Sequence, residues 1–347
     1  MRKTGLTAFA LTLLLSGAAF ADTDIRFTLG WKTQGSDAAM LLALDKGYFT
    51  QEGLNVTIDQ GEGSGATVTR IMSGTYDAGF GDINAIIQNA AARPDAAPVM
   101  VYNMWSKPPF TIVSRKETGI ETPADLEGKT LGGAQGTPTT RLLPVLARFN
   151  DVDLGTIRVD NMAPNLQEPM LIRGDIDGAL VFNITSYFNL LQNRQDPEAD
   201  FNWLNFGEYG LDLYSNGVMV SQAMIRDNPD AVRGLVRAIN RAAVEIGLDQ
   251  EAGGDAVIAY DNFANRDIEM QRLRYAYENL IVSDENAKLG MGDLDDARLT
   301  KAIGIVVEGY DLPTTPEASQ IFSREFLPAR EAVSYTHLRA HETLRYL

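Results

Sequence analysis

The chain has no cysteine, and its only histidines, His337 and His341, lie close to its C-terminus. Without cysteine it can form neither a disulfide nor a thiolate nucleophile, and it offers no sulfur ligand to a metal. Residues 1–336 also lack the imidazole that Ser-His-Asp and Cys-His catalysis need and that zinc centres favour. We therefore expect no catalytic group, no bound metal and no resident cofactor.

Basic residues are in the minority, with 30 Lys and Arg against 46 Asp and Glu, and the formal net charge is -16. A chain of this charge repels the phosphate backbone, so no nucleic-acid partner is expected. Long apolar runs are also missing. The run at residues 6–15 is too short to span a bilayer, and no later segment approaches that length.

The first 21 residues have the features of a cleavable secretory signal. Arg2 and Lys3 precede the short apolar run, and Ala19-Phe20-Ala21 provides a small-x-small exit ahead of Asp22. With no cysteine to carry a lipid anchor, the mature protein is expected to be free in the periplasm. Residues 334–347 continue no pattern of the preceding segment, and they are predicted to be an artefactual or disordered tail.

The remaining chain is long enough for two domains, and apolar strands alternate along it with amphipathic helical segments. Strands are predicted at residues 25–29, 54–58, 78–80 and 99–104, and a second alternating set begins near residue 110. Beyond residue 230 the pattern is helical. This order is typical of an α/β fold with mostly parallel sheets flanked by helices and with extra C-terminal helices.

Two passages, residues 73–82 and 173–183, echo each other. In each a helix stops on a glycine, an aspartate precedes a short buried strand, and a polar residue stands where the next helix starts. Ligands of open α/β sheets bind beyond the carboxyl ends of the strands. Asp82 and Asn183 are therefore predicted to face one cleft from opposite lobes.

Three blocks of sequence carry a resemblance to a known family. They are residues 29–56 with 73–77, residues 114–132, and residues 216–220 with 228–248. Together they resemble the periplasmic substrate-binding proteins of ABC importers, in the branch that serves thiamine-pyrimidine precursors, sulfonates, taurine and nitrate. The likeness covers nearly all of residues 24–328, and its motifs identify the scaffold better than the cargo.

The resemblance implies a two-lobed type II periplasmic-binding-protein fold that closes on a small-molecule ligand and presents it to an inner-membrane permease. It places the crossovers near Ser114 and Asn216, so that residues 22–113 and 217–333 form lobe 1 and residues 114–216 form lobe 2. Two strands between rigid lobes can absorb a hinge rotation. The protein is expected to be a monomer.

Candidate ligand-binding residues are those at strand ends and helix starts. The resemblance implies a stacking role for Trp31, whereas free amide groups at helix N-termini attract anions. For each residue, capping or packing is the alternative. The candidates are Trp31, Ser64, Gly65, Asp82, Asn84, Asn103 and Trp105, and then Gly136, Thr137, Thr139, Phe182, Asn183, Thr185, Tyr187, Glu208 and Tyr209.

The aromatic candidates, with Asp82 and Glu208 as acceptors, favour a flat nitrogen heterocycle such as a thiamine-type pyrimidine precursor. One alternative is a sulfonate, taurine or nitrate receptor that holds its oxyanion with helix N-termini and Arg141. Another is an exported enzyme that binds a nucleotide cofactor at the glycine-rich residues 61–66. The family also has a eukaryotic branch that makes the pyrimidine from its own histidine, a vitamin cofactor and a cysteine-rich motif. Because this chain has no cysteine, and no histidine before residue 337, we expect binding and no catalysis.

Overall fold

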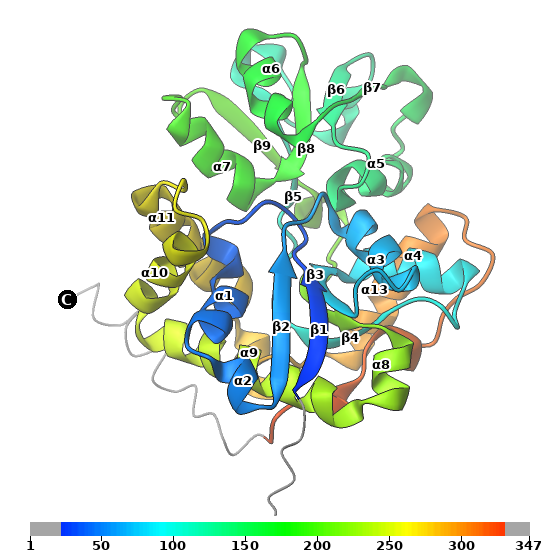
Figure 1. The fold of residues 1–347 in the computed structure, drawn as a ribbon. Helices are drawn as coiled ribbons and strands as arrows, with labels where there is room; N and C mark the ends of the chain where they lie inside the picture. Colours follow the sequence, from blue (N-terminus) through cyan, green and yellow to red (C-terminus); the bar gives the residue numbers. More distant parts are fainter. Residues whose placement is uncertain (1–21, 330–347) are drawn as a thin grey trace, which may run out of the picture.

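The computed structural model describes residues 22–329 and shows two lobes, each built on one five-stranded sheet (Figure 1). The predicted signal segment, residues 1–21, and the predicted tail, residues 334–347, lie outside the described residues. Both lobes have helices packed against their sheets, which confirms the predicted two-lobed α/β architecture.

The sheet of lobe 1 has the order β2-β1-β3-β10-β4. Strands β1, β2 and β3 are parallel, whereas β10 runs antiparallel to both β3 and β4. The sheet is therefore mixed, because β10 enters it on the return from the other lobe. Its strands are β1 (Thr23–Thr28), β2 (Leu54–Asp59), β3 (Ala78–Asp82), β4 (Val99–Asn103) and β10 (Asn216–Val220).

The sheet of lobe 2 repeats this pattern in the order β7-β6-β8-β5-β9. Its first three strands are parallel, and β5, which arrives from lobe 1, runs antiparallel to β8 and β9. Its strands are β5 (Phe110–Arg115), β6 (Thr130–Gly133), β7 (Arg158–Asn161), β8 (Gly178–Phe182) and β9 (Phe201–Asn205).

The two echoing passages of the sequence form equivalent structures. Helices α3 (Ser64–Met72) and α6 (Gln167–Arg173) are each followed by a glycine in the left-handed region, Gly74 at φ 73° and Gly174 at φ 82°. Asp77 then accepts the backbone N–H of Arg26 in β1 at 2.8 Å. In lobe 2, Asp177 accepts the backbone N–H of Thr130 in β6, also at 2.8 Å. Each aspartate therefore fixes the entry of one strand beside its parallel neighbour.

Helices follow the strands in both lobes. Those of lobe 1 are α1 (Ala38–Asp45), α2 (Tyr48–Gln51), α3 (Ser64–Met72) and α4 (Ile83–Ala92). Those of lobe 2 are α5 (Pro138–Phe149), α6 (Gln167–Arg173) and α7 (Asn183–Gln192). Helix α4 begins where it does because the Asp82 carboxylate accepts the N–H of Asn84 at 2.9 Å, which satisfies a free amide at the helix start.

The predicted C-terminal helices are present and enlarge lobe 1. They are α8 (Gln222–Asp227), α9 (Pro229–Leu248), α10 (Gln250–Tyr260), α11 (Arg266–Ala276), α12 (Asp284–Leu289), α13 (Asp296–Gly309) and α14 (Ala318–Ile321). Helices α9 and α10 pack on α1, while α11 extends across the cleft to α7 of lobe 2 (Figure 1). Within residues 22–329, no helix is long and apolar enough to cross a membrane.

The chain crosses between the lobes twice, at residues 104–109 and 206–215. The first crossover comes earlier than the predicted boundary near Ser114, because Ser114 pairs with Gly178 and Asn202 inside the second sheet. The apolar run at 110–114 is thus a strand of lobe 2.

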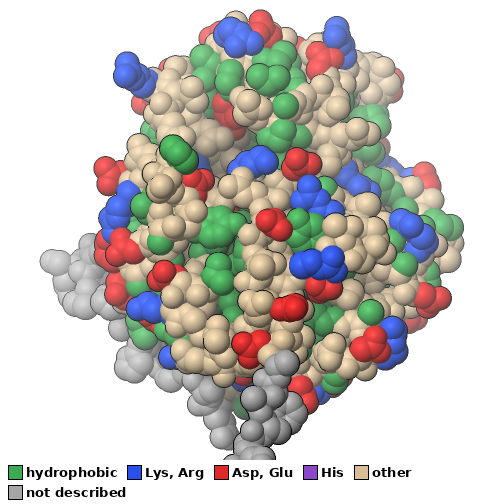
Figure 2. All heavy atoms as spheres, viewed as in Figure 1, with side chains coloured by type: hydrophobic (Ala, Val, Ile, Leu, Met, Phe, Trp, Pro, Cys, Tyr) green, Lys and Arg blue, Asp and Glu red, His purple; other side chains and the backbone are tan. Residues whose placement is uncertain are grey.

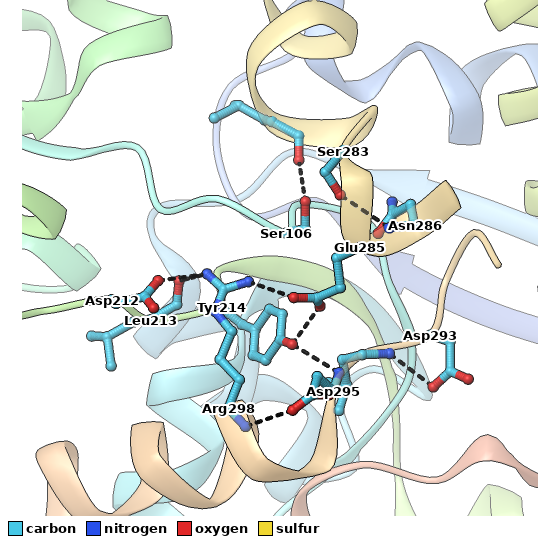
Figure 3. Close-up of polar contacts among 12 residues, drawn as sticks. Ser106, Asp212, Leu213, Tyr214, Ser283, Glu285, Asn286, Asp293, Asp295 and Arg298 are labelled. Carbon is cyan, nitrogen blue, oxygen red and sulfur yellow. Dashed lines mark hydrogen bonds and ion pairs between the residues drawn. The ribbon is translucent and has the colours of Figure 1, made fainter. Parts of the chain in front are cut away.

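Both crossovers are tied to the C-terminal part of the chain (Figure 3). In the first, Ser106 donates its backbone N–H to the carbonyl of Leu280 at 2.9 Å. In the second, the hydroxyl of Tyr214 donates to Glu285 and accepts the N–H of Asp295 at 2.8 Å. Arg298 completes this anchor with an ion pair of 3.1 Å to Glu285. The two connecting segments are therefore held by one group of residues.

Candidate ligand pocket between the lobes

A pocket lies between the two lobes, with about 610 Å³ of space between protein atoms, its open mouth included. Lobe 1 and the crossovers contribute Gly30, Trp31, Gln34, Asp37, Gly63, Ser64, Phe80, Trp105 and Asn216. Lobe 2 contributes Thr137, Pro138, Pro164, Gln167, Glu168, Leu180, Val181, Phe182, Thr185, Ser186 and Asn189.

Aromatic side chains form one part of the wall. Trp105, which is 1% exposed, meets Phe80 edge to face at a centroid distance of 5.5 Å and Phe182 at 6.1 Å. Trp31 stands in the same pocket and is half-buried. The indole nitrogen of Trp105 is buried, and it has no hydrogen-bond partner among the described residues. The wall therefore offers apolar ring surface together with one unused N–H donor.

Carboxyl groups form another part of the wall. Asp37 belongs to the short 3-10 turn Gly35–Asp37 of lobe 1, and Glu168 belongs to α6 of lobe 2. They are 3% and 4% exposed. Glu168 accepts hydrogen bonds from Ser186 at 2.5 Å and from Asn189 at 3.1 Å, both in α7. The Asp37 carboxylate accepts the N–H of Gln34 at 3.0 Å.

Behind these carboxyls, Arg272 of α11 is buried and forms an ion pair with Glu269 at 2.8 Å. Arg272 also donates to the side-chain oxygen of Asn189 at 3.1 Å, so it links lobe 1 to lobe 2. Burial lowers the pKa of Arg272 and raises the pKa of Glu269. Burial also raises the pKa of Asp37 to about 8, with Glu269 raising it further and the Gln34 N–H and Arg272 opposing the rise.

The lobes touch each other around the pocket. The N–H of Gly65, at the start of α3, donates to the carbonyl of Gly136 in lobe 2 at 3.1 Å. Thr185 donates to the side chain of Gln34 at 3.2 Å, and Arg141 donates to Gln88. These contacts between lobes indicate that the structure is a closed form of the cleft.

In this closed form the backbone N–H groups at the start of α3 already have hydrogen-bond acceptors. Gly65 donates to Gly136, and the next two amides, of Ala66 and Thr67, both donate to the carbonyl of Gly63. Gly63 has φ 114°, and a Cβ placed on it would lie 2.5 Å from the Gly136 carbonyl oxygen. Gly63, together with the predicted site residues Gly65 and Gly136, thus allows the two backbones to approach each other.

Six of the predicted site residues line the pocket. They are Trp31, Ser64, Trp105, Thr137, Phe182 and Thr185. Gly65 and Gly136 lie beside it, in the contact between the lobes described above.

Four other predicted residues are buried outside the pocket lining, and the side chains of three of them form hydrogen bonds within the protein. Asp82 caps α4 and accepts from Ser215 at 3.1 Å, while Asn84 donates to the carbonyl of Tyr214 at 2.9 Å. Thr139 donates to the carbonyl of Val181 at 2.9 Å. Asn103 is fully buried, and its backbone N–H donates to Gly292. Asp82 and Asn183 were predicted to face one cleft from opposite lobes, and neither of them lines the pocket.

The last four predicted residues lie away from the pocket because each is turned to a neighbour in lobe 2. The side chain of Asn183 accepts the N–H of the next residue, Ile184, at 2.6 Å. The Tyr187 hydroxyl donates to Glu198 at 3.0 Å. Glu208 accepts from Asn205 at 3.0 Å, and the Tyr209 hydroxyl donates to the carbonyl of Glu121 at 3.1 Å.

The sequence analysis missed the polar half of the pocket. These side chains come from loops and first helical turns, and the buried polar ones among them are Gln34, Asp37, Gln167, Glu168 and Asn216, with Ser186 on the inner face of α7. One signal was available: polar residues stand at positions of α6 and α7 where the helical period predicts apolar ones.

Charges of both signs are interspersed over the face of the molecule shown in Figure 2, so no patch of a single sign marks a partner surface on that face. Across residues 22–329, no group of three His, Cys, Asp or Glu side chains is arranged to hold a metal ion.

Comparison with known proteins supports the fold and the family. The sequence model of the family described as "NMT1/THI5 like" matches residues 35–251. The solved structure of the alkanesulfonate-binding protein SsuA from Xanthomonas axonopodis pv. citri, bound to MOPS, superposes with a TM-score of 0.66 at 15% identity. It covers 88% of this chain and 99% of that one. This similarity confirms the predicted periplasmic-binding-protein fold.

Two curated relatives differ in what their names describe. The 4-amino-5-hydroxymethyl-2-methylpyrimidine phosphate synthase of Schizosaccharomyces pombe is 25% identical over 236 residues, which are 65% of this chain and 66% of that protein. The riboflavin-binding protein RibY of Chloroflexus aurantiacus is 23% identical over 316 residues, or 84% of this chain and 82% of that protein. The chain thus spans just under two thirds of the length of the synthase.

The prediction that the chain is not an enzyme is contradicted by this comparison. Relatives from Schizosaccharomyces pombe, Aspergillus parasiticus and Saccharomyces cerevisiae are all named as synthases. The prediction relied on the residue types that are missing from the chain. The similarity runs instead through the scaffold, which binding proteins and synthases share.

Proposed function

Because the chain belongs to the NMT1/THI5-like family, we propose that it captures a small flat nitrogen heterocycle between its two lobes. The proposed ligand is of the thiamine-type pyrimidine precursor kind. The protein acts outside the cytoplasm and delivers this ligand to the permease of an ABC importer. The observation that carries the proposal is the closed pocket between the lobes, with its aromatic wall and its polar side chains.

The aromatic residues support a flat ligand. Trp31, Phe80, Trp105 and Phe182 all line the pocket, and rigid rings of this kind lose little conformational entropy when they contact a ligand. A planar heterocycle can stack on such rings while its edge atoms form hydrogen bonds to the polar side of the pocket. The names of the relatives agree with this chemistry, since a pyrimidine and riboflavin are both flat nitrogen heterocycles.

The oxyanion alternative has less support. The lining residues include the carboxyl groups of Asp37 and Glu168 and no Lys, Arg or His. Arg141, the predicted anion partner, donates to Gln88 in the other lobe. The amides of Gly65, Ala66 and Thr67 at the start of α3 already have backbone acceptors. A sulfonate in this pocket would therefore meet two carboxyl groups and no basic side chain among the lining residues.

The nucleotide-cofactor alternative has less support for the same reason. A dinucleotide loop needs glycines that leave backbone N–H groups free for phosphate oxygens. Here the N–H of Gly61 donates to Trp31 and that of Gly63 donates to Gly30. The glycine-rich loop is therefore closed by the protein's own backbone.

Binding can be tested by calorimetry and thermal shift with 4-amino-5-hydroxymethyl-2-methylpyrimidine, riboflavin, taurine and nitrate as probes. A ligand that binds only the folded form raises the melting temperature with its concentration. We expect a shift with at least one heterocycle and none with taurine or nitrate. A response to the anions alone would refute the proposal.

The role of Trp31 can be tested with a matched pair of variants. Trp31→Ala is expected to lower heterocycle affinity by about 10-fold or more, because it removes a stacking surface. Trp203→Ala is the control, since Trp203 lies on β9 outside the pocket and donates to the carbonyl of Pro197. Equal effects of the two variants would remove Trp31 from the site.

The names of the curated relatives favour a second candidate, the formation of a pyrimidine phosphate. Incubation of the purified protein, followed by mass spectrometry of the small molecules released, distinguishes it from simple capture. A receptor releases only the ligand that was added, whereas a synthase yields a pyrimidine that was absent at the start.

A further inference from the structure

Residues 280–298, named the clamp segment here, hold one end of each crossover between the lobes (Figure 3). In the first crossover, the carbonyl of Leu280 accepts the backbone N–H of Ser106 at 2.9 Å and its hydroxyl at 3.3 Å. Leu280 lies in the last turn of a helical stretch, where carbonyl groups have no acceptor role within the helix. The first crossover therefore satisfies a carbonyl that the helix leaves free.

The second crossover is held by Arg298, which contacts three consecutive residues. Its guanidinium donates to the Asp212 carboxylate at 2.9 Å and to the Leu213 carbonyl at 3.2 Å. The same group lies 4.1 Å from the centre of the Tyr214 ring. Glu285 fixes the guanidinium from the other side with an ion pair of 3.1 Å. The planar, branched guanidinium is suited to such contacts, because it carries several donors in fixed directions.

The clamp segment itself is bonded to lobe 1. Arg324 donates to the Asp293 carboxylate at 2.7 Å and to the Leu294 carbonyl at 2.6 Å. Asn103, at the end of β4, donates its backbone N–H to the carbonyl of Gly292 at 2.8 Å. The ends of the crossovers that the clamp segment holds are therefore parts of lobe 1.

The opposite ends of the crossovers are bonded to lobe 2. In the first crossover, the carbonyl of Pro109 accepts the N–H of Asn183 at 2.9 Å. In the second, the Tyr209 carbonyl accepts a hydrogen bond from Asn150 at 3.1 Å. The Tyr209 hydroxyl also donates to the carbonyl of Glu121 at 3.1 Å. These ends therefore belong to lobe 2.

Only residues 107–108 and 210–211 remain between the two held ends. Among the described residues, no hydrogen bond joins these four to the body of either lobe. The two crossovers run close together here, since a Cβ placed on Gly207 would lie 3.7 Å from the ring of Pro108. Gly210 has φ 93°, in a region that glycine enters at little cost, so its backbone can take up a rotation.

We propose that the lobes open by rotating about a double pivot at residues 107–108 and 210–211, and that Arg298 keeps the pivot there by holding the second crossover to lobe 1. Trp105 and Asn216 of the pocket lie on the lobe 1 side of this pivot, and the N–H of Trp105 donates to the carbonyl of Asn216 at 2.8 Å. Both therefore stay with lobe 1 when the cleft opens. The inference goes beyond the proposed function, because it concerns the motion of the lobes and applies whatever the ligand is.

A variant that keeps the cleft open tests the pivot without any ligand. Gly136→Phe places a large side chain between the lobes, since even a Cβ at Gly136 would lie 3.2 Å from the carbonyl oxygen of Glu62 in lobe 1. The chain has no cysteine, so introduced cysteines are its only sites for thiol-reactive spin labels. Double electron–electron resonance then measures the distance between two labels with and without Gly136→Phe.

Three label pairs locate the pivot, and all of them share Ala223→Cys on α8 of lobe 1. The second label is placed at Ala199→Cys, Glu208→Cys or Asp212→Cys, and all four positions are exposed. Opening should shift the distances to residues 199 and 208, which lie on the lobe 2 side. The distance to residue 212 should stay the same, because the Leu213 carbonyl is still held by Arg298.

Arg298→Gln then tests the clamp in the presence of Gly136→Phe. It should free the second crossover, so that the distance from Ala223→Cys to Asp212→Cys also shifts. Lys301→Gln is the matched control on the same helix, since Lys301 is exposed and holds neither crossover. If Arg298→Gln does not fold, Arg298→Lys takes its place, because one ammonium group replaces the branched guanidinium while the charge is kept.

Each result supports or overturns the inference. If residue 212 moves as far as residue 208 while Arg298 is intact, the pivot lies elsewhere and the inference is wrong. It is also wrong if none of the three distances responds to Gly136→Phe, since the lobes then do not turn about the crossovers. If residue 212 stays in place in the Arg298 variant, Arg298 is not the clamp. None of these measurements uses a ligand, so a failure of heterocycle binding is a separate result.

Discussion

The two lobes have the same sheet order but use it differently at the cleft. In lobe 1 the junction of β3 and α4 holds Asp82, which is fully buried and bonded to Asn84 and Ser215. In lobe 2 the corresponding junction of β8 and α7 holds Phe182, whose ring lines the pocket. One junction is thus used to hold lobe 1 together, and the other provides a wall for a ligand.

A second difference lies in the C-terminal helices. Lobe 1 carries α11, whose buried Arg272 reaches Asn189 of lobe 2, whereas lobe 2 contacts lobe 1 through α5, whose Arg141 donates to Gln88. The comparison teaches that a repeated scaffold fixes where a cleft lies, while its lining depends on the single residues at the junctions and on what the extra elements add.

The largest effect is expected at the link that only lobe 1 supplies. Arg272→Gln leaves Glu269 and its neighbours buried without their cation, and we expect it to lower the free energy of unfolding by about 3–5 kcal/mol. Arg274→Gln is the matched control on the same helix, since Arg274 is exposed and pairs with Glu251 at 3.6 Å. Its expected cost is at most about 1 kcal/mol.

Urea denaturation measures the free energy of unfolding of both variants. A loss of stability that is equally small in the two would show that the contact of α11 with lobe 2 contributes little to the closed form.

The next effect concerns pH and should appear only at the lobe 1 junction. Burial raises the pKa of Asp82 to about 7, against the opposing hydrogen bonds from Ser215 and Asn84. Because the folded-state pKa lies above the ordinary value of 3.8, the neutral carboxyl stabilises the fold at low pH. This contribution is lost as the pH rises from about 4 through about 7.

Asp82→Asn should therefore remove roughly 3–4 kcal/mol of the fall in the free energy of unfolding between pH 4 and 8. Denaturant titrations at both pH values measure it. Asn183→Ala, at the lobe 2 junction, should leave the pH dependence as it is in the unmodified protein. If the free energy of unfolding changes equally with pH in Asp82→Asn and in the unmodified protein, the raised pKa of Asp82 is not the source of the pH dependence.

A smaller effect tests whether the echoing aspartates are equivalent. Asp77→Ala and Asp177→Ala each remove the acceptor of one strand N–H, and each should lower the free energy of unfolding by about 1–3 kcal/mol. Asp175→Ala is the control, because Asp175 forms only an exposed ion pair with Arg173. If the two variants lose free energies of unfolding that differ by several-fold, the two aspartates are not energetically equivalent although their sequences are similar.

The smallest effect is expected for Gly65→Ala, which should change closure of the lobes without lowering the stability of either lobe. Gly65→Ala suits the start of α3, but its Cβ would lie 2.8 Å from Arg141 and 3.1 Å from the Gly136 carbonyl, both in lobe 2. We expect ligand affinity to fall about 10-fold, while the free energy of unfolding of the unliganded protein holds or rises by up to about 1 kcal/mol.

Gly304→Ala, in α13 with open space around its Cα, should give a gain in stability with no change in affinity. If Gly65→Ala binds the ligand as well as the unmodified protein does, the contact between Gly65 and Gly136 is not part of the closed, ligand-bound form.

Local signals in the chain were sufficient for the scaffold. The alternation of strands and helices, the glycine stops at Gly74 and Gly174 and the aspartates that follow them all appear in the structure as predicted. Trp31, Trp105 and Phe182, which were proposed because they stand at or just after the carboxyl ends of strands, line the pocket.

The lobe boundary and the polar wall were not predictable in the same way. The run at 110–114 reads as a strand wherever it pairs, and only the register with β8 and β9 assigns it to lobe 2. A polar residue at a strand end either binds a ligand or caps a helix. Asp82 caps a helix, and its carboxylate also accepts a hydrogen bond from Ser215, which is distant in the sequence.

The sequence by itself determined the elements, their order and the family, because hydrophobic period, glycine stops and caps act over a few residues. Only the tertiary structure decided which side chains face the ligand space. Asp37, Glu168 and Arg272 come from three segments far apart in the chain, and Glu168 of lobe 2 joins the other two only when the lobes close. Burial then raises the pKa of Asp37 and lowers that of Arg272, and no local pattern encodes burial across a cleft.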